Sequence, residues 1–288
     1  MKTAVIDIGG TAIKAGIFEN GKVTQVREYQ TQAWRGAEAV LQSVIEIIEA
    51  GPAADAIGVS TTGQIDAVEG KVSFAGPNIP GYQGLEIGKI LSDHFGVRAA
   101  VENDVNAAAL GEAHYGAGRT KGDFLCLTYG TGIGGAIIEN GELYRGHHYA
   151  AGEFGGIVVH PEDCNRTDPF SGCYERYASV TALVDQAKKV CAELTSGRDI
   201  FAHAKEPEVA AVINDWVDEI AIGLVTLIHI FNPSAILLGG GVMNQKILPA
   251  KIQQQVTPAI MESFRDVQIL KTQLGNEAGM YGAAYLAQ

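Results

Sequence analysis

The sequence predicts an α/β fold built from two similar domains, because one pattern of strands, glycine turns and hairpins occurs in it twice. The first copy is an apolar β-rich run at 2–8, the turn Gly9-Gly10-Thr11, and two further runs joined by Asn20-Gly21. The second copy, from Phe124 to Arg145, repeats this order at a constant offset of 131 − 11 = 120 positions. Asn-Gly between strand-like runs is the strongest short-range signal of a hairpin. We therefore infer an internal duplication.

Helical patterns alternate with the strands. Residues 37–50 carry apolar side chains at helical spacing, and 57–60 form a short β-rich run. Residues 104–115 predict another helix, and the patterns at 180–194 and 209–231 predict two long ones. This alternation is typical of an α/β fold.

Domain boundaries follow from the glycines after the 104–115 helix. Gly116-Ala117-Gly118 is expected to end that helix and to form a hinge. The expected domains are a small N-terminal one at 1–117 and a large one at 118–275, with a C-terminal helix at about 276–288 packing back on the first.

Composition excludes several classes of function. The net charge of −12 and the pI near 5.0 disfavour nucleic acid and anionic membrane surfaces as partners. The longest apolar stretch, 220–231, is too short to span a bilayer. Four cysteines without paired spacing, and a start without a signal-peptide pattern, predict a cytoplasmic location.

Glycine turns after buried strands predict a nucleotide site. Such turns let backbone approach a phosphate closely, while a hydroxyl and an ammonium nearby donate to it. Tight hairpin turns are the alternative for any one of them, and the duplication favours the phosphate interpretation. A third turn, at 239–241, offers flat backbone for adenine and ribose. The residues expected to contact ATP are Asp7, Gly9, Gly10, Thr11, Lys14, Gly130, Thr131, Gly132 and Gly240, with Asp7 also a candidate Mg²⁺ ligand.

Asp104 is the candidate general base. It stands where a strand is expected to end and a helix to begin, so a helix N-cap is the alternative role. The helix dipole keeps such a carboxylate ionised, which suits a base that accepts a proton during phosphoryl transfer. Candidate sugar-binding residues on loops are Asn78, Asn103, Glu153 and Glu175, and a solvated loop position is the alternative for each.

Five stretches together resemble the ROK (repressor, open reading frame, kinase) family of sugar kinases and regulators. They are DIGGTAIKAGIF at 7–18, VENDVNAAALGE at 101–112, LTYGTGIGGAI at 127–137, AGEFG at 151–155 and LLGGGV at 237–242. The resemblance implies the duplicated actin-like ATPase (ribonuclease H-like) fold, phosphorylation of a hexose 6-hydroxyl with ATP and Mg²⁺, and a homodimer. It also implies that Asp104 is the base and that Gly63, Asn78, Asn103, Glu153 and Glu175 line the sugar.

The chain departs from the family pattern at its structural zinc site. A histidine of relatives, which also touches the sugar near its first and second carbons, is Gly156 here, and Arg166 and Asp168 replace two cysteines. We expect no structural zinc of the usual kind. A different site from His160, Cys164 and Cys173 is the remaining alternative, although its spacing matches no common pattern.

The absence of this histidine leaves the identity of the sugar substrate undecided. Room near the first two carbons favours a substituted hexose, either N-acetylmannosamine or a β-glucoside, over plain glucose. The stretches at 60–66 and 75–84 look more like N-acetylmannosamine kinases, and RGHHYAAGEFG at 145–155 looks more like β-glucoside kinases. The alternative classes are a transcriptional regulator, which would need a DNA-binding segment ahead of Asp7, and a non-catalytic sugar-binding protein.

Two histidine positions remain. His229, in an apolar helical pattern, is expected to be a core histidine rather than a ligand. His147-His148 is expected either near the sugar or in a polar turn.

Overall fold

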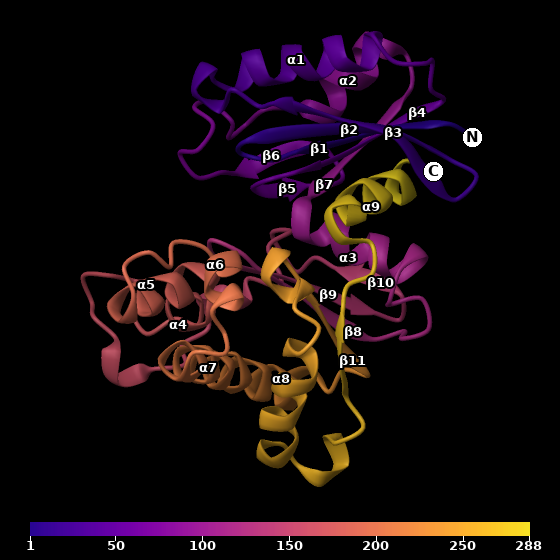
Figure 1. Cartoon of the computed structure of the whole chain (residues 1–288). Coiled ribbons are helices and arrows are strands. Elements are labelled where there is room, and N and C mark those ends of the chain that lie inside the picture. The colour runs from indigo at the N-terminus through magenta and orange to yellow at the C-terminus, as the bar shows by residue number, and fades with distance from the viewer. The chain divides into compact units, whose positions relative to one another are not determined.

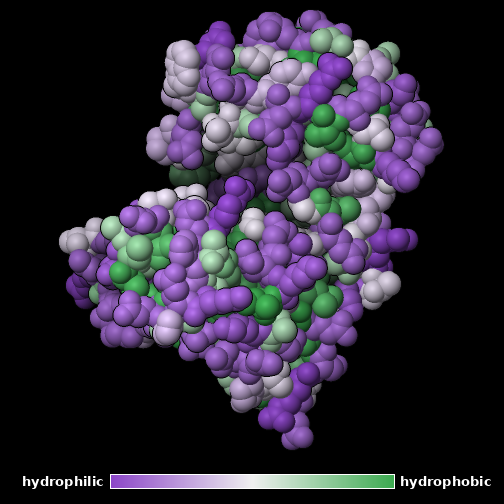
Figure 2. All heavy atoms as spheres, in the orientation of Figure 1, coloured by the Kyte–Doolittle hydropathy of each residue, from purple (hydrophilic) through white to green (hydrophobic).

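The computed structural model describes all residues, 1–288, and separates them into two compact units (Figure 1). The first unit comprises 1–120, 137–151 and 276–288, and the second comprises 121–136 and 152–275. Hydrophilic residues dominate the face drawn in Figure 2, and hydrophobic ones occur there in small separate groups. No helix has both the length and the apolar character needed to cross a membrane.

The first sheet has the order β3-β2-β1-β4-β7. Strands β1 and β2, and β2 and β3, pair antiparallel, whereas β1, β4 and β7 are parallel. Asn20 and Gly21 have φ of 53° and 77°, the left-handed backbone that a two-residue hairpin turn needs, so this predicted hairpin is confirmed. The strands are β1 (Thr3–Ile8), β2 (Ala12–Glu19), β3 (Lys22–Gln30), β4 (Ala56–Thr61) and β7 (Arg98–Asn103), with β5 (Gln64–Asp66) and β6 (Lys71–Phe74) forming a separate hairpin.

The second sheet repeats this topology in the order β10-β9-β8-β11-β12, which confirms the duplication. Asn140 and Gly141, with φ of 53° and 80°, form the matching turn. Strand β9 begins at Ile133 and takes Gly134 and Gly135 into the sheet, so that residues 130–132 alone form the turn after β8. The strands are β8 (Phe124–Tyr129), β9 (Ile133–Glu139), β10 (Glu142–Tyr144), β11 (Ala235–Gly239) and β12 (Gln268–Lys271).

Helices cover both faces of the first sheet. Helices α1 (Ala37–Glu49) and α2 (Ile87–Phe95) lie on one face, and α9 (Ala278–Ala287) lies on the other beside α3 (Asp104–Tyr115) (Figure 1). The buried side of α1 consists of the apolar residues that gave its helical pattern, including Val40 and Val44. These packed layers hold the carboxyl ends of β1, β4 and β7 in place.

Helices α3 and α9 pack with their backbones in direct contact. A side chain at Gly282 would collide with the carbonyl of Ala107, and one at Gly111 would collide with that of Ala278. Only glycine permits this approach. The last helix therefore lies directly against the helix that begins with Asp104.

The helices of the second unit are α4 (Glu175–Ala178), α5 (Val180–Val190), α6 (Gly197–Ala202), α7 (Pro207–Phe231) and α8 (Leu248–Val256). The expectation of one helix over 180–194 was wrong, since α5 ends at Val190 and α6 follows separately. His229 is exposed rather than in the core, and its Nδ1 lies 2.8 Å from the Val225 carbonyl. One side of this 25-residue helix faces solvent, and its largely apolar sequence did not show that His229 lies on that side. Short 3-10 helices occupy Ala33–Arg35, Phe154–Gly156, Pro161–Asp163, Gly241–Asn244, Thr257–Ala259, Glu262–Phe264 and Gly275–Glu277.

Candidate functional site

In the first unit, the turn after β1 brings a carboxylate and an ammonium together. Asp7 Oδ1 accepts a hydrogen bond from the Ser60 hydroxyl at 2.8 Å, and Asp7 Oδ2 lies 3.8 Å from Lys14 Nζ. The β1–β4 register explains the first contact, because it pairs Asp7 with Ser60. Burial raises the pKa of Asp7, against the opposing effects of the Ser60 bond and the Lys14 charge.

The turn itself uses one of its own donors. The Gly9 N–H donates to the Ala12 carbonyl at 2.9 Å, and the Gly9 carbonyl accepts from the Thr31 hydroxyl at 2.7 Å. Gly9 N–H is therefore committed to the turn, whereas Gly10 and Thr11 are exposed. An atom added as Cβ at Gly10 meets nothing within 4 Å, so an incoming phosphate has access to this backbone.

Asn103, not Asp104, is the N-cap of α3. Its Oδ1 accepts from the N–H groups of Val105 at 2.9 Å and Asn106 at 3.1 Å, and its Nδ2 donates to the Gly63 carbonyl at 2.9 Å. The N-cap alternative for Asp104 is therefore wrong. Its neighbour Asn103 caps the helix instead. The same residue is joined by a hydrogen bond to Gly63, so two predicted sugar-site residues are in contact.

The carboxylate of Asp104 begins α3 in a partly buried position. Burial, with a smaller contribution from the negative charge of Asp7, raises its pKa to about 6 against the opposing effect of hydrogen bonds from Val105 and Asn103. The charge of Asp104 in turn contributes to raising the pKa of Tyr82 to about 12, mainly a burial effect. The side chains of Asp7 and Tyr82 are thus both neighbours of the Asp104 carboxylate. Burial close to a second carboxylate is an arrangement found at catalytic acid–base groups.

Glu102, to which the sequence analysis gave no role, directly precedes the N-cap residue Asn103 in β7. It is fully buried; its Oε1 accepts from the Asn103 N–H at 3.0 Å and from Asn106 Nδ2 at 3.1 Å. Its Oε2 lies 2.8 Å from Arg145 Nε. A buried carboxylate needs such partners, and the clue in the sequence was an acidic residue inside an otherwise apolar strand.

Asn78 is exposed in a turn and takes no part in the hydrogen bond between Gly63 and Asn103. Its expected role in sugar binding stays a prediction.

In the second unit, the turn at 130–132 is held by the start of α5. The Gly130 N–H donates to the Gly132 carbonyl at 3.0 Å, the Gly130 carbonyl accepts from Val180 N at 2.9 Å, and the Thr131 carbonyl accepts from the Thr181 hydroxyl at 2.8 Å. The Gly130 N–H, like that of Gly9, is therefore used within its own turn. Gly130 and Thr131 are exposed, and space is open at a Cβ on Gly130.

Two predicted sugar-site carboxylates lie near this turn. An added Cβ at Gly132 would stand 2.7 Å from Glu175 Oε2, which lies 3.5 Å from the Ile133 nitrogen. Burial raises the pKa of Glu153, and the charge of Glu175 raises it further, so the second unit brings Glu153 and Glu175 together. Gly240, with φ of 99°, is packed against the carbonyl of Tyr129, which is a structural reason for glycine there.

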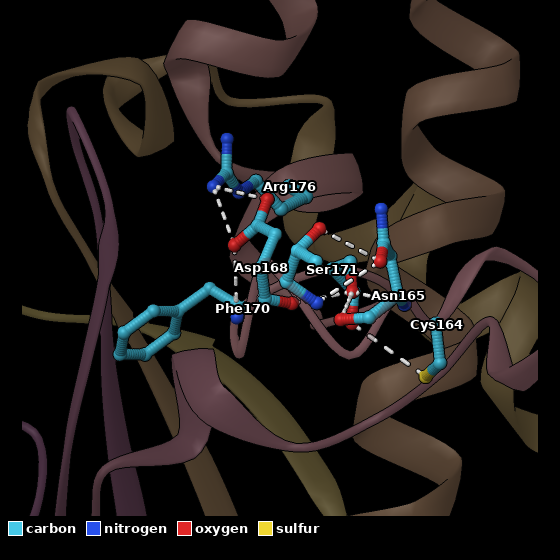
Figure 3. Close-up of polar contacts among 7 residues, drawn as sticks. Cys164, Asn165, Asp168, Phe170, Ser171 and Arg176 are labelled. Carbon is cyan, nitrogen blue, oxygen red and sulfur yellow. Dashed lines mark hydrogen bonds and ion pairs between the residues drawn. The ribbon is translucent and has the colours of Figure 1, made fainter.

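The loop in which the family pattern would place a zinc site is closed here by hydrogen bonds (Figure 3). The Ser171 hydroxyl accepts from Asn165 N–H at 2.6 Å and lies 2.6 Å from the Asp168 carbonyl. Asp168 Oδ1 accepts from Phe170 N–H at 3.1 Å, and Asp168 Oδ2 pairs with Arg176 at 3.2 Å. Asp168, which stands where the family pattern has a cysteine, thus ties the loop to Arg176, the residue after Glu175.

His160 belongs to a different network from the one a zinc site needs. Its Nδ1 lies 3.0 Å from Glu162 and its Nε2 lies 2.8 Å from Glu219, and these hydrogen bonds raise its pKa. Cys164 Sγ lies 3.6 Å from the Ser171 carbonyl, and Cys173 Sγ lies 3.3 Å from that of Gly156. No group of three His, Cys, Asp or Glu side chains could hold a metal ion, so the alternative zinc site from His160, Cys164 and Cys173 is not formed.

A chelator is therefore expected to leave the thermal unfolding midpoint of the protein without ATP unchanged. Replacing Ser171 with Ala is expected to lower the free energy of unfolding by about 1 kcal/mol, because the Asn165 N–H loses its acceptor. Differential scanning calorimetry of both proteins, with and without chelator, checks this. A midpoint that falls when the chelator is added would contradict a loop held by hydrogen bonds.

Comparisons with known proteins agree with this arrangement of strands and turns. The profile of the ROK family matches residues 3–288. A beta-glucoside kinase of Listeria monocytogenes is 33% identical over 99% of this chain and 97% of its own. A ROK family glucokinase from Streptomyces griseus, solved with glucose and AMPPNP, superimposes with a TM-score of 0.84 at 31% identity over 100% of this chain and 99% of that one. A putative N-acetylmannosamine kinase from Listeria monocytogenes gives a TM-score of 0.89 at 29% identity, covering 99% and 98%. This chain belongs to the ROK family and has its actin-like ATPase fold.

Proposed function

We propose that this protein is an ATP-dependent sugar kinase that transfers the γ-phosphoryl group to the 6-hydroxyl of a hexose. One observation carries the proposal: a partly buried carboxylate, Asp104, whose pKa is raised to about 6, lies near the Asp7–Lys14 pair of an accessible glycine turn. That combination supplies a base and a phosphate-binding group within one unit. The glucose and AMPPNP bound by the Streptomyces griseus relative support a sugar and a nucleotide as the two ligands.

In this mechanism, Asp104 takes the proton from the attacking hydroxyl as that oxygen bonds to the γ-phosphorus and the bond to the β-phosphate oxygen breaks. Asn103 fixes the start of α3 and the Gly63 carbonyl, and so orients the base. Lys14 and the backbone at Gly10 and Thr11 bind the phosphates. Most of the rate enhancement in phosphoryl transfer comes from such positioning and charge stabilisation.

The residues present fit a magnesium ion. Asp7 presents carboxylate oxygens at the end of β1, beside the turn proposed to bind phosphate, and Mg²⁺ prefers oxygen ligands of this kind. When bound with ATP, the ion would neutralise charge on the β- and γ-phosphates. Asp7 is the residue proposed to hold it.

The sugar is proposed to carry a substituent at its second or anomeric carbon. Gly156 is exposed, and a Cβ added there meets nothing within 4 Å, so the space that a histidine fills in relatives is open. Glu153 and Glu175 are the proposed acceptors of sugar hydroxyls. N-acetylmannosamine and β-glucosides both fit this description, and glucose itself fits it less well.

The experiment is a screen of ADP formation with glucose, N-acetylmannosamine, N-acetylglucosamine, mannose, fructose and cellobiose, with the phosphorylated carbon identified by NMR. We expect the highest kcat/KM for a substituted sugar and a phosphate on the 6-oxygen. Clear preference for unsubstituted glucose would overturn the argument from Gly156. Absence of turnover with every sugar would overturn the kinase proposal.

The rate of phosphorylation is expected to fall as the pH drops through about 6, the raised pKa of Asp104. The sign follows from the role of the group, because only the ionised carboxylate accepts a proton, and protonation below its pKa removes the base. The measurement is kcat/KM for the preferred sugar as a function of pH at saturating ATP. A rate that stays constant to about pH 4, near an ordinary aspartate pKa, would contradict the assignment.

A further inference from the structure

Residues 145–151, which we call the ring loop, follow β10 and form a loop whose two ends are hydrogen-bonded to each other. The Ala151 N–H donates to the Arg145 carbonyl at 3.0 Å. Gly146 makes the turn with φ of 69°, and a Cβ there would stand 3.0 Å from the Cβ of Ala151. A loop closed in this way loses little freedom when a ligand binds to it.

The first anchor of the ring loop is Arg145. Its guanidinium donates to the fully buried carboxylate of Glu102 at 2.8 Å, and Glu102 accepts from the Asn103 N–H at 3.0 Å. Asn103 caps the helix that begins with Asp104. One side chain therefore links the start of the ring loop to the strand end that carries the proposed base.

The second anchor is Tyr149. Its φ of 59° is left-handed, which is a rare and strained backbone for a bulky residue and persists only where the surroundings fix it. Burial raises the pKa of the Tyr149 phenol and the charge of Asp66 raises it further, so this phenol is a neighbour of Asp66, which ends β5 three positions after Gly63. Because the Gly63 carbonyl accepts from Asn103 Nδ2, both anchors lead back to the residue next to Asp104.

Between the anchors the ring loop presents two more rings. His147 and His148 are exposed, and their ring centroids are 4.1 Å apart with an angle of 52° between the planes. Imidazole and phenol rings combine a flat face with polar edge atoms that donate or accept hydrogen bonds. A pyranose ring has the complementary pair of features, a face of C–H groups and a rim of hydroxyls.

We propose that the ring loop is a subsite for the second sugar ring of a β-glycoside whose first ring is phosphorylated. This inference rests on the proposed kinase function and names its substrate class. A hexose that turns its 6-hydroxyl to Asp104 has its anomeric carbon across the ring, so a glycosidic substituent extends away from the base. The Arg145–Glu102 contact ties the ring loop to the strand end that carries Asn103, and on this ground we assign the substituent to the ring loop. The acetamido group of N-acetylmannosamine is too small to occupy a face of several rings.

The test measures sugar binding and turnover separately, on the full chain. Isothermal titration of cellobiose and glucose without ATP gives the affinities, and ADP formation gives kcat and KM. We expect cellobiose to bind at least about tenfold more tightly than glucose, a typical gain from extra contacts in a preformed site. In the variant carrying His147→Ala and His148→Ala, the affinity for cellobiose should fall about tenfold more than that for glucose. The variant carrying His147→Phe and His148→Phe, which keeps the ring faces, should retain most of the preference.

His203→Ala, which removes an exposed histidine of the second unit, serves as the matched control and should change neither affinity. Equal loss for cellobiose and glucose in the double alanine variant, or no loss for either, would overturn the subsite. Tight binding of cellobiose without phosphoryl transfer would overturn the kinase function and leave the subsite standing. Phosphorylation of N-acetylmannosamine with no preference for cellobiose would overturn the subsite and leave the kinase function standing.

Discussion

Replacing Asp104 with Asn is expected to reduce kcat for sugar phosphorylation by about 10³–10⁴-fold, because the general base and the positioning of the hydroxyl are lost together. The amide keeps the size of the carboxylate and retains an oxygen that can accept from the Val105 N–H, as Asp104 Oδ1 does at 2.9 Å. Sugar affinity measured by titration should therefore change little. Steady-state ADP formation at saturating sugar and ATP measures the effect.

The matched control for this variant is Asp185→Asn, which removes an exposed carboxylate from α5. It should retain the turnover of the unmodified protein. Near-normal turnover in the Asp104 variant would refute the assignment of the base, and loss of sugar binding would mean that the carboxylate mainly holds substrate.

Replacing Glu102 with Gln is expected to lower the free energy of unfolding by about 3 kcal/mol and to reduce turnover as well. The change leaves the partly buried Arg145 guanidinium beside a buried neutral amide, and a charge held out of water without its partner is costly. The same change weakens the acceptor of the Asn103 N–H, so the start of α3, with the proposed base Asp104, is held less firmly. Urea denaturation measures stability, and ADP formation measures turnover.

A double variant separates the two effects of Glu102. With Glu102→Gln and Arg145→Met together, no unpaired charge remains, and stability should recover substantially. Turnover should stay low, because the link between the ring loop and the strand end at Asn103 is still broken. Recovery of both quantities would show that the pair serves folding alone.

Much of the fold could be predicted because its signals are local. The Asn-Gly pairs fix their hairpins through left-handed backbone, and the same residues at a constant offset predicted the duplication that the matching strand orders of the two sheets confirm. The error over which residue caps α3 has a simple cause. Asn103 and Asp104 are adjacent and both have side chains suited to capping, so only the backbone conformation distinguishes them.

The contacts of the site are less predictable because they join residues far apart in the sequence. Ser60 meets Asp7 only through the register of β1 and β4, and Arg145 meets Glu102 across 43 positions. Neither the register between two strands nor the path of a loop can be predicted from a local sequence pattern. The loss of the zinc ligands could be seen in the sequence, whereas the role of Ser171 as the centre of the replacement network depends on how residues 165–176 fold back on themselves.

The glycine contacts between α3 and α9 have a consequence for the order of events during synthesis. Residues 1–120 leave the ribosome early, yet the surface of α3 beside Ala107 and Gly111 is covered only by Ala278–Ala287, which are made more than 150 residues later. Domains generally fold as their residues emerge, so residues 152–275 have the chance to fold while the helix bearing Asp104 is still uncovered. A ribosome-bound chain stopped before residue 278 should therefore be protease-sensitive at α3, and this sensitivity should disappear once α9 has emerged and packed against it.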